Sequence, residues 1–180
     1  IKHGKPVFYG IQIKNDSIQY VDNHLSIFEI GSMTKVFTST LLAQLVEENK
    51  VNLDDPINRY LDILIKDNSQ ITFRQLSNHT SGLPRLPANM IITYPQNPYK
   101  DYNEDNLRQY LSDKMKLIAN PSEKYEYSNL GAGLLGYLEA KIEKTSYDNL
   151  LQKRILSKYG MSNTTTNRQL VADRLVKGLD

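Results

Sequence analysis

The stretch Phe28–Lys50 reads FEIGSMTKVFTSTLLAQLVEENK, and it decides the predicted fold. From Ser32 to Glu48 its apolar residues recur at helical spacing, so we expect a long helix buried on most sides. The apolar stripe comprises Val36, Phe37, Thr40, Leu41, Leu42, Ala43, Leu45 and Val46. Lys35 lies one turn inside the start of this helix, where the helix dipole disfavours a cation. The position of this lysine therefore needs a reason.

A catalytic role for Lys35 would supply that reason. The spacing of three places the hydroxyl of Ser32 and the amine of Lys35 on one helix face. A serine hydroxyl is a weak nucleophile that needs an adjacent base, and an amine is such a base only where its surroundings lower its pKa. A helix N-terminus supplies positive potential and N–H groups that can bind an oxyanion. The alternative is a serine helix cap beside a solvated lysine.

A second candidate motif is Tyr127-Ser128-Asn129, in a polar segment just before another predicted helix. A tyrosine beside a lysine can relay protons, and an asparagine amide can orient both a substrate carbonyl and a lysine. The alternative is that Ser128 or Asn129 only caps the helix that follows.

The composition excludes several function classes. The chain has 180 residues, of which 39% are hydrophobic, enough for a globular core. Its net charge of +2 comes from scattered basic residues, which argues against a nucleic-acid partner. The absence of cysteine excludes zinc–thiolate sites and cysteine nucleophiles. The three histidines (His3, His24 and His79) do not have the spacing of metal ligands.

The order of predicted elements is strands first and helices afterwards, which indicates an α+β fold. Residues 5–21 predict a β-hairpin that turns at KNDS, and this sheet is too small to stand alone. Residues 84–102 hold four of the seven prolines and predict a long surface excursion. Four further helices are predicted. One starts at a Thr72–Gln75 capping box, and one starts at an Asn103 cap and buries Leu107, Leu111 and Met115. The other two run from Leu130 to Ile142 and from a Ser146 cap to about Tyr159.

Taken together, the motifs resemble the serine β-lactamase and penicillin-binding-protein superfamily, and most closely its class C branch. That branch also holds D-alanyl-D-alanine carboxypeptidases, D-aminopeptidases and related esterases. The resemblance covers nearly the whole chain and rests on FEIGSMTKVF, NLDDPINRYL, QLSNHTSGLP, YEYSNLGAGLLG and LLQKRILSKYGM in this order. It implies the N-terminal part of a β-lactamase/transpeptidase-like fold, with residues 1–27 as strands of the sheet region and residues 28–180 as the mainly helical region.

The resemblance also implies a role for each motif residue. Ser32 would be acylated, Lys35 would share general-base work with Tyr127, and Asn129 would bind the amide of the substrate. The backbone N–H of Ser32 would be one oxyanion donor. The implied activity is that of a serine hydrolase on β-lactam or D-alanyl peptide-like carbonyls, without metal or organic cofactor, in a bacterial periplasm or outside the cell. An esterase, a D-aminopeptidase or a non-hydrolytic penicillin-binding sensor remains an alternative.

One element of this superfamily is missing from the sequence. The family carries K-T-G or H-T-G on a C-terminal strand that supplies the second oxyanion donor. Lys144–Ser146 and His79–Gly82 only approximate this motif and are not expected on such a strand. We therefore expect the chain to be part of a longer protein whose C-terminal segment, or another chain, completes the sheet. Without that partner we expect it to be inactive and poorly stable.

Two further patterns have structural rather than functional interpretations. Gly131–Gly136 matches G-x-G-x-x-G, but no buried strand precedes it, so we expect these glycines to allow close helix packing. A Ser-His-Asp triad is disfavoured because no G-x-S-x-G elbow occurs. His79 is instead expected to bond locally and brace the loop around TSGLP.

Overall fold

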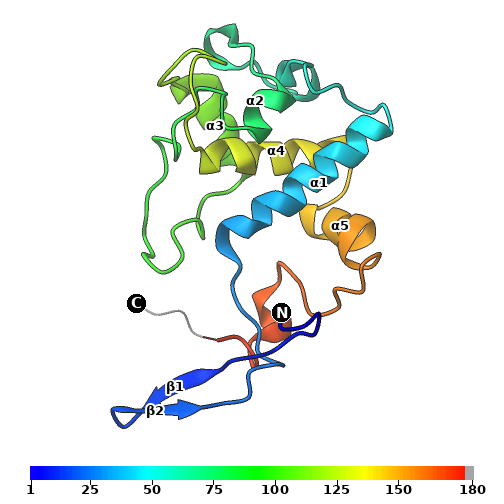
Figure 1. Ribbon diagram of the computed structural model, residues 1–180. Helices are drawn as coiled ribbons and strands as arrows, with labels where there is room; N and C mark the ends of the chain where they lie inside the picture. The colour runs from blue at the N-terminus through cyan, green and yellow to red at the C-terminus, as the bar shows by residue number, and fades with distance from the viewer. Residues whose placement is uncertain (177–180) are drawn as a thin grey trace. The chain divides into compact units, whose positions relative to one another are not determined.

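The computed structural model describes residues 1–176 and divides into two compact units (Figure 1). The first unit comprises Ile1–Gly31 and the segment that starts at Met161; the second comprises Ser32–Gly160. Strands occur in the first unit and α-helices in the second, so the predicted α+β class is confirmed. Within residues 1–176, no helix is both long enough and apolar enough to cross a membrane.

The first unit contains the predicted hairpin in a shorter form. Strands β1 (Ile11–Lys14) and β2 (Ser17–Tyr20) pair antiparallel, with Ile11 opposite Tyr20. Asn15 and Asp16 form the turn with φ of 50° and 58°, a conformation that Asn and Asp tolerate. Every residue of both strands is exposed, as expected for a sheet too small to bury a face. Elsewhere in this unit Ile27 forms a parallel bridge with Leu175, beyond the short helix η6 (Arg168–Val171).

The second unit is helical. Its α-helices are α1 (Thr34–Glu47), α2 (Phe73–Ser77), α3 (Glu104–Gln109), α4 (Asn129–Ile142) and α5 (Tyr147–Leu151). Its other helical segments are η1 (Gly31–Met33), which begins at the last residue of the first unit, η2 (Ile57–Tyr60), η3 (Lys66–Asn68), η4 (Tyr110–Lys114) and η5 (Gln152–Leu156). The helix predicted from Ser146 to about Tyr159 thus changes from α to π geometry at Gln152.

Helix α4 is the centre of this unit and packs against α1, α2 and α5 (Figure 1). Its leucines Leu130, Leu134, Leu135 and Leu138 are all buried, as are Leu41, Leu42 and Leu45 of α1. Each fully buried leucine contributes about 1.5–3 kcal/mol through the hydrophobic effect. This packing fixes the N-terminal end of α4 relative to α1, and both predicted motifs lie at these helix ends.

Local signals placed several helix starts correctly. The capping box of Thr72 and Gln75 is present at α2, and Asn103 caps α3. Ser146 caps α5 by accepting a hydrogen bond from the Asn149 N–H. The predicted buried edge of Leu107, Leu111 and Met115 is also confirmed.

Two predictions about the helices hold only in part. Helix α1 is buried or half-buried at most positions, as predicted, but it has an exposed strip that includes Val36 of the apolar stripe, which is 66% exposed. The glycines of α4 also differ from one another. A Cβ at Gly131 or Gly136 would lie 3.3 Å or 3.1 Å from a neighbouring side chain, which confirms close packing there. At Gly133 a Cβ would meet nothing within 4 Å, so close packing does not explain this glycine.

Candidate active site

The two predicted motifs meet at the hydroxyl of Ser32. Ser32 lies in η1, immediately before α1, and is exposed. Its Oγ accepts hydrogen bonds from Lys35 Nζ at 3.1 Å and from the Tyr127 hydroxyl at 2.8 Å. Met33 occupies the N-cap position of α1, and no side chain caps the helix there. The interpretation of Ser32 as an ordinary helix cap is therefore wrong.

Lys35 connects Ser32 to the second motif. Besides its bond to Ser32, its Nζ donates to Asn129 Oδ1 at 2.9 Å. The same nitrogen lies 4.9 Å from the centroid of the Tyr127 ring. The alternative of a solvated lysine therefore does not hold, because Lys35 contacts three polar residues of the candidate site.

Tyr127 has a cationic environment. Hydrogen bonding to Lys35, and then to Ser32, lowers the pKa of Tyr127, and the charges of Lys35 and Arg85 act in the same direction. The Arg85 guanidinium carbon lies 5.3 Å from the centroid of the ring. Nearby cations favour the phenolate because they stabilise its negative charge. A tyrosine of this kind can accept a proton more readily than an ordinary one.

Ser128 holds the Tyr127-Ser128-Asn129 motif in place through hydrogen bonds within the second unit. It is buried, and its Oγ donates to the Pro84 carbonyl at 2.7 Å while accepting from the Gly131 N–H at 2.8 Å. Ser128 is thus the N-cap of α4, as the structural alternative for this motif predicted. The N–H groups of Asn129 and Leu130 both donate to the Arg85 carbonyl at 3.1 Å. The role of Ser128 as a helix cap therefore does not exclude catalytic roles for Tyr127 and Asn129.

His79 supports the same segment from the other side. Its Nδ1 accepts the Ser128 N–H at 3.2 Å, and its carbonyl accepts the Glu126 N–H at 2.7 Å. Its ring centroid lies 4.6 Å from that of Tyr127. Burial, and then the charge of Lys35, lowers the pKa of His79, which favours the neutral imidazole that can accept this bond. We expected His79 to bond within its own loop. It instead bonds to residues 126–128.

The turn after His79 has a shape that only glycine permits. Gly82 has a φ of +73°, and a Cβ there would lie 2.1 Å from the Ala119 carbonyl oxygen. The Ile118 N–H donates to the Gly82 carbonyl at 2.9 Å. This close approach sets the course of the chain into Pro84 and Arg85, whose carbonyls hold the start of α4.

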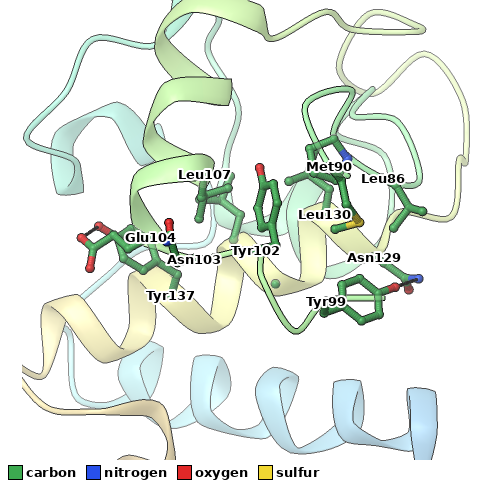
Figure 2. A pocket seen from close by; sticks show the side chains of 13 residues that line it. Leu86, Met90, Tyr99, Tyr102, Asn103, Glu104, Leu107, Asn129, Leu130 and Tyr137 are labelled. Atoms are coloured by element: carbon green, nitrogen blue, oxygen red, sulfur yellow. Dashed lines mark hydrogen bonds between the residues drawn. The ribbon is translucent and has the colours of Figure 1, made fainter. Parts of the chain in front are cut away.

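The predicted excursion of residues 84–102 borders the site. Asn129 Nδ2 donates to the Tyr99 hydroxyl at 3.0 Å (Figure 2). A cavity of about 280 Å³ extends from these two residues along α4. Sequence reasoning did not find Tyr99 or Arg85. Neither lies in a recognisable chemical motif, and only the fold brings them to Tyr127 and Asn129.

Other predicted features lie away from this site or have no counterpart. Lys144–Ser146 falls between α4 and α5, as expected for a sequence that only approximates K-T-G. Within residues 1–176, no group of three or more His, Asp or Glu side chains could hold a metal ion.

Known proteins resemble this chain in both sequence and structure. Residues 1–178 match the Beta-lactamase family. A Beta-lactamase-like protein 2 of Dictyostelium discoideum is 34% identical over 88% of this chain and 29% of its own length. A beta-lactamase of Pseudomonas fluorescens is 28% identical over 91% of this chain and 43% of its own. The chain thus spans less than half the length of these relatives, which come from both bacteria and Dictyostelium.

Solved structures give the same assignment. A β-lactamase/D-alanine carboxypeptidase from Yersinia pestis, complexed with citrate, superposes with a TM-score of 0.77 at 28% identity, over 94% of this chain and 52% of that one. A class C β-lactamase superposes with a TM-score of 0.70 at 26% identity, over 89% of this chain and 42% of that one. On the evidence of motif order, fold and these matches, the chain belongs to the serine β-lactamase and penicillin-binding-protein superfamily and forms an N-terminal portion of its fold.

Proposed function

We propose that this chain carries the nucleophile of a serine hydrolase that acts through an acyl-enzyme at Ser32. The observation that carries the proposal is the convergence of Lys35 Nζ and the Tyr127 hydroxyl on Ser32 Oγ, at 3.1 Å and 2.8 Å. A nucleophile within hydrogen-bond reach of proton-accepting groups is the general arrangement for covalent catalysis.

In the acylation step, Ser32 Oγ bonds to the carbonyl carbon of the substrate. Its proton passes to the Tyr127 phenolate, which the adjacent Lys35 ammonium stabilises. The carbonyl C–N or C–O bond then breaks, and the departing nitrogen or oxygen takes up that proton. In deacylation, water bonds to the ester carbon, gives a proton to the same pair, and Ser32 Oγ leaves as its hydroxyl.

Substrate positioning is assigned to Asn129 and to backbone groups. The Asn129 amide would bind an amide on the acyl side of the substrate, while its Oδ1 keeps Lys35 in place. The Ser32 N–H, at the start of α1, would donate to the oxyanion. This chemistry needs no metal or organic cofactor.

The preferred substrates are β-lactams or D-alanyl peptides. Similarity to a β-lactamase/D-alanine carboxypeptidase supports this choice. An esterase or a D-aminopeptidase is the alternative within hydrolases, and a D-amino acid amidase from Ochrobactrum anthropi is among the similar structures. A penicillin-binding sensor would acylate at Ser32 but release the acyl group very slowly.

Intact-mass spectrometry of the full-length protein that carries this chain, after incubation with penicillin G, tests the proposal. We expect the protein mass to rise by that of one penicillin, with peptide mapping placing the adduct on Ser32. Ser32→Ala should abolish the adduct, whereas Ser39→Ala, an exposed serine farther along α1, should retain it. Equal labelling of the wild type and Ser32→Ala would refute the proposal.

The lifetime of the adduct separates the alternatives. A hydrolase should lose the acyl group and turn over nitrocefin, whereas a sensor should keep it. Parallel rates on short acyl esters and D-alanyl peptides distinguish an esterase or aminopeptidase from a β-lactamase.

A further inference from the structure

The guanidinium of Arg85 lies over the ring of Tyr127. Its central carbon is 5.3 Å from the ring centroid, a distance at which a cation and an aromatic face attract each other. The backbone explains this placement, because the Arg85 carbonyl accepts the N–H groups of Asn129 and Leu130 at the start of α4. The side chain of Arg85 thus begins close to the tyrosine whose hydroxyl bonds to Ser32.

Arg85 differs from the other arginines of the second unit in its lack of a carboxylate partner. It is exposed, and no Asp or Glu among the described residues forms a salt bridge with it. The other four arginines of the unit each contact a carboxylate, at distances between 2.6 Å and 3.0 Å: Arg59, Arg74, Arg108 and Arg154. Since no carboxylate neutralises it, the positive charge of Arg85 acts on the aromatic ring beneath it.

The other titratable groups around Tyr127 come from α1, from the turn before Gly82 and from its own segment. Lys35 Nζ lies 4.9 Å from the ring centroid and adds a second positive charge. The ring centroid of His79 lies 4.6 Å away, but burial, and then the charge of Lys35, lowers the pKa of His79 and favours its neutral form. On the segment of Tyr127 itself, Glu126 is paired with Lys124 at 3.1 Å.

We propose that Arg85 is a positioning residue for acylation, whose guanidinium stabilises the Tyr127 phenolate that takes the proton of Ser32. A guanidinium keeps its charge over the whole pH range in which enzymes work, so this stabilisation does not depend on pH. Hydrogen bonds to Lys35 and Ser32 are the larger causes of the lowered pKa of Tyr127, and the charge of Arg85 adds to them. The role rests on the proposed acylation of Ser32 and names a further residue that serves it.

The pH profile of acylation tests this role in the full-length protein that carries this chain. The acylation rate with penicillin G should rise with pH as Tyr127 ionises. In Arg85→Gln we expect the midpoint of this rise to move up by roughly 0.5–1 pH unit, because an exposed positive charge has been removed from beside the phenolate. The variant should be slower than the wild type on the acidic side and at least as fast on the alkaline side, since a less stabilised phenolate is a stronger base. A merely structural defect would lower the rate at every pH.

Matched variants separate the charge of Arg85 from its shape. Arg85→Lys keeps a positive charge and should keep the midpoint close to that of the wild type. Arg168→Gln removes an exposed guanidinium of η6 and should leave the profile unchanged. In about 1 M NaCl, where the Debye length is about 3 Å, the difference between the wild type and Arg85→Gln should shrink. An unchanged midpoint in Arg85→Gln, or the same midpoint in the Lys and Gln variants, would overturn the role.

An NMR titration of isotope-labelled tyrosines distinguishes failure of this role from failure of the proposed function. It follows the ionisation of Tyr127 without any substrate, with Tyr127→Phe assigning the signal. If Ser32 is not acylated but the Tyr127 midpoint is higher in Arg85→Gln than in the wild type, the proposed function fails and the effect of Arg85 on Tyr127 remains. If acylation proceeds but the Tyr127 midpoint is the same in both proteins, the role of Arg85 alone is wrong.

Discussion

Two polar side chains, Ser128 at the N-cap of α4 and Glu139 within α4, are fully buried, yet their surroundings differ completely. Ser128 caps the helix, donates to Pro84 and accepts from Gly131, while its N–H is bound by His79. Glu139, in the last third of the helix, has no hydrogen-bond partner for either carboxylate oxygen. The buried polar group that helps to position Tyr127 and Asn129 is thus satisfied completely, whereas the Glu139 carboxyl, on the side of α5, is left without hydrogen bonds.

The physical consequence for Glu139 is a changed protonation state. Burial raises the pKa of Glu139 to about 9, so its carboxyl is neutral in the folded protein near pH 7. The nearby Tyr147 hydroxyl is bonded to Thr38 Oγ1 at 2.8 Å and gives Glu139 no hydrogen bond. Unlike Ser128, Glu139 therefore lowers the stability of the fold at any pH at which its carboxyl ionises in the unfolded chain.

The largest expected effect is that of Glu139→Gln. Above its ordinary pKa of 4.5, Glu139 loses its proton only in the unfolded chain, so wild-type stability should fall as pH rises from about 4.5 to about 9. Glu139→Gln removes this dependence, and the variant should be more stable by about 3 kcal/mol at pH 7 but not at pH 4. Urea denaturation at these pH values measures the difference.

A matched surface change provides the control for Glu139. Glu47→Gln alters an exposed residue of α1 and should leave the pH dependence as it is. If wild type and Glu139→Gln lose stability equally between pH 4 and pH 9, Glu139 does not carry a raised pKa.

A smaller effect is expected at the satisfied end of α4. Ser128→Ala leaves the Gly131 N–H and the Pro84 carbonyl without this partner, and should destabilise the fold by about 1–2 kcal/mol. Ser146→Ala removes the cap of α5 at a less buried site and should have a smaller effect, about 0.5–1 kcal/mol. Denaturant midpoints compare the two, and an equal loss at both would show that the buried network adds nothing beyond a cap.

The smallest effect is expected at His79. His79→Asn keeps a residue that tolerates its φ of 63° but shortens the side chain that accepts the Ser128 N–H. We expect a loss of about 0.5–1 kcal/mol, together with slower acylation of Ser32. His3→Asn, at a φ of 51° in the exposed N-terminal segment, is the control and should change neither quantity. Unchanged acylation in His79→Asn would limit its role to stability.

Sequence reasoning succeeded where the signal is local. The capping box of Thr72, the cap at Asn103 and the turn at Asn15 and Asp16 each depend on a few neighbouring residues, and all three are present. The pairing of Ser32 with Lys35 also follows from helical spacing alone. Their meeting with Tyr127 was an expectation from the resemblance, because spacing carries no information about segments so far apart.

Features that depend on tertiary packing could not be predicted. The exposed face of α1 and the buried carboxylate of Glu139 both depend on which side of each helix meets a neighbour. Arg85 and Tyr99 come from an excursion without periodicity, so no pattern indicated that they reach Tyr127 and Asn129. Gly133 belongs to the same G-x-G-x-x-G match as Gly131 and Gly136. Only the structure shows that a Cβ at Gly133 would have no neighbour within 4 Å, whereas a Cβ at either of the others would.

The contact of Gly82 with Ala119 has a consequence for folding kinetics. The turn at Gly82 forms only after residues 83–118 have closed into a loop, which costs conformational entropy before the contact gives any stabilisation. During synthesis, Ser32 and α1 leave the ribosome well before Tyr127 does, since the N-terminal part is made first. The nucleophile is therefore made well before the tyrosine that hydrogen-bonds to it.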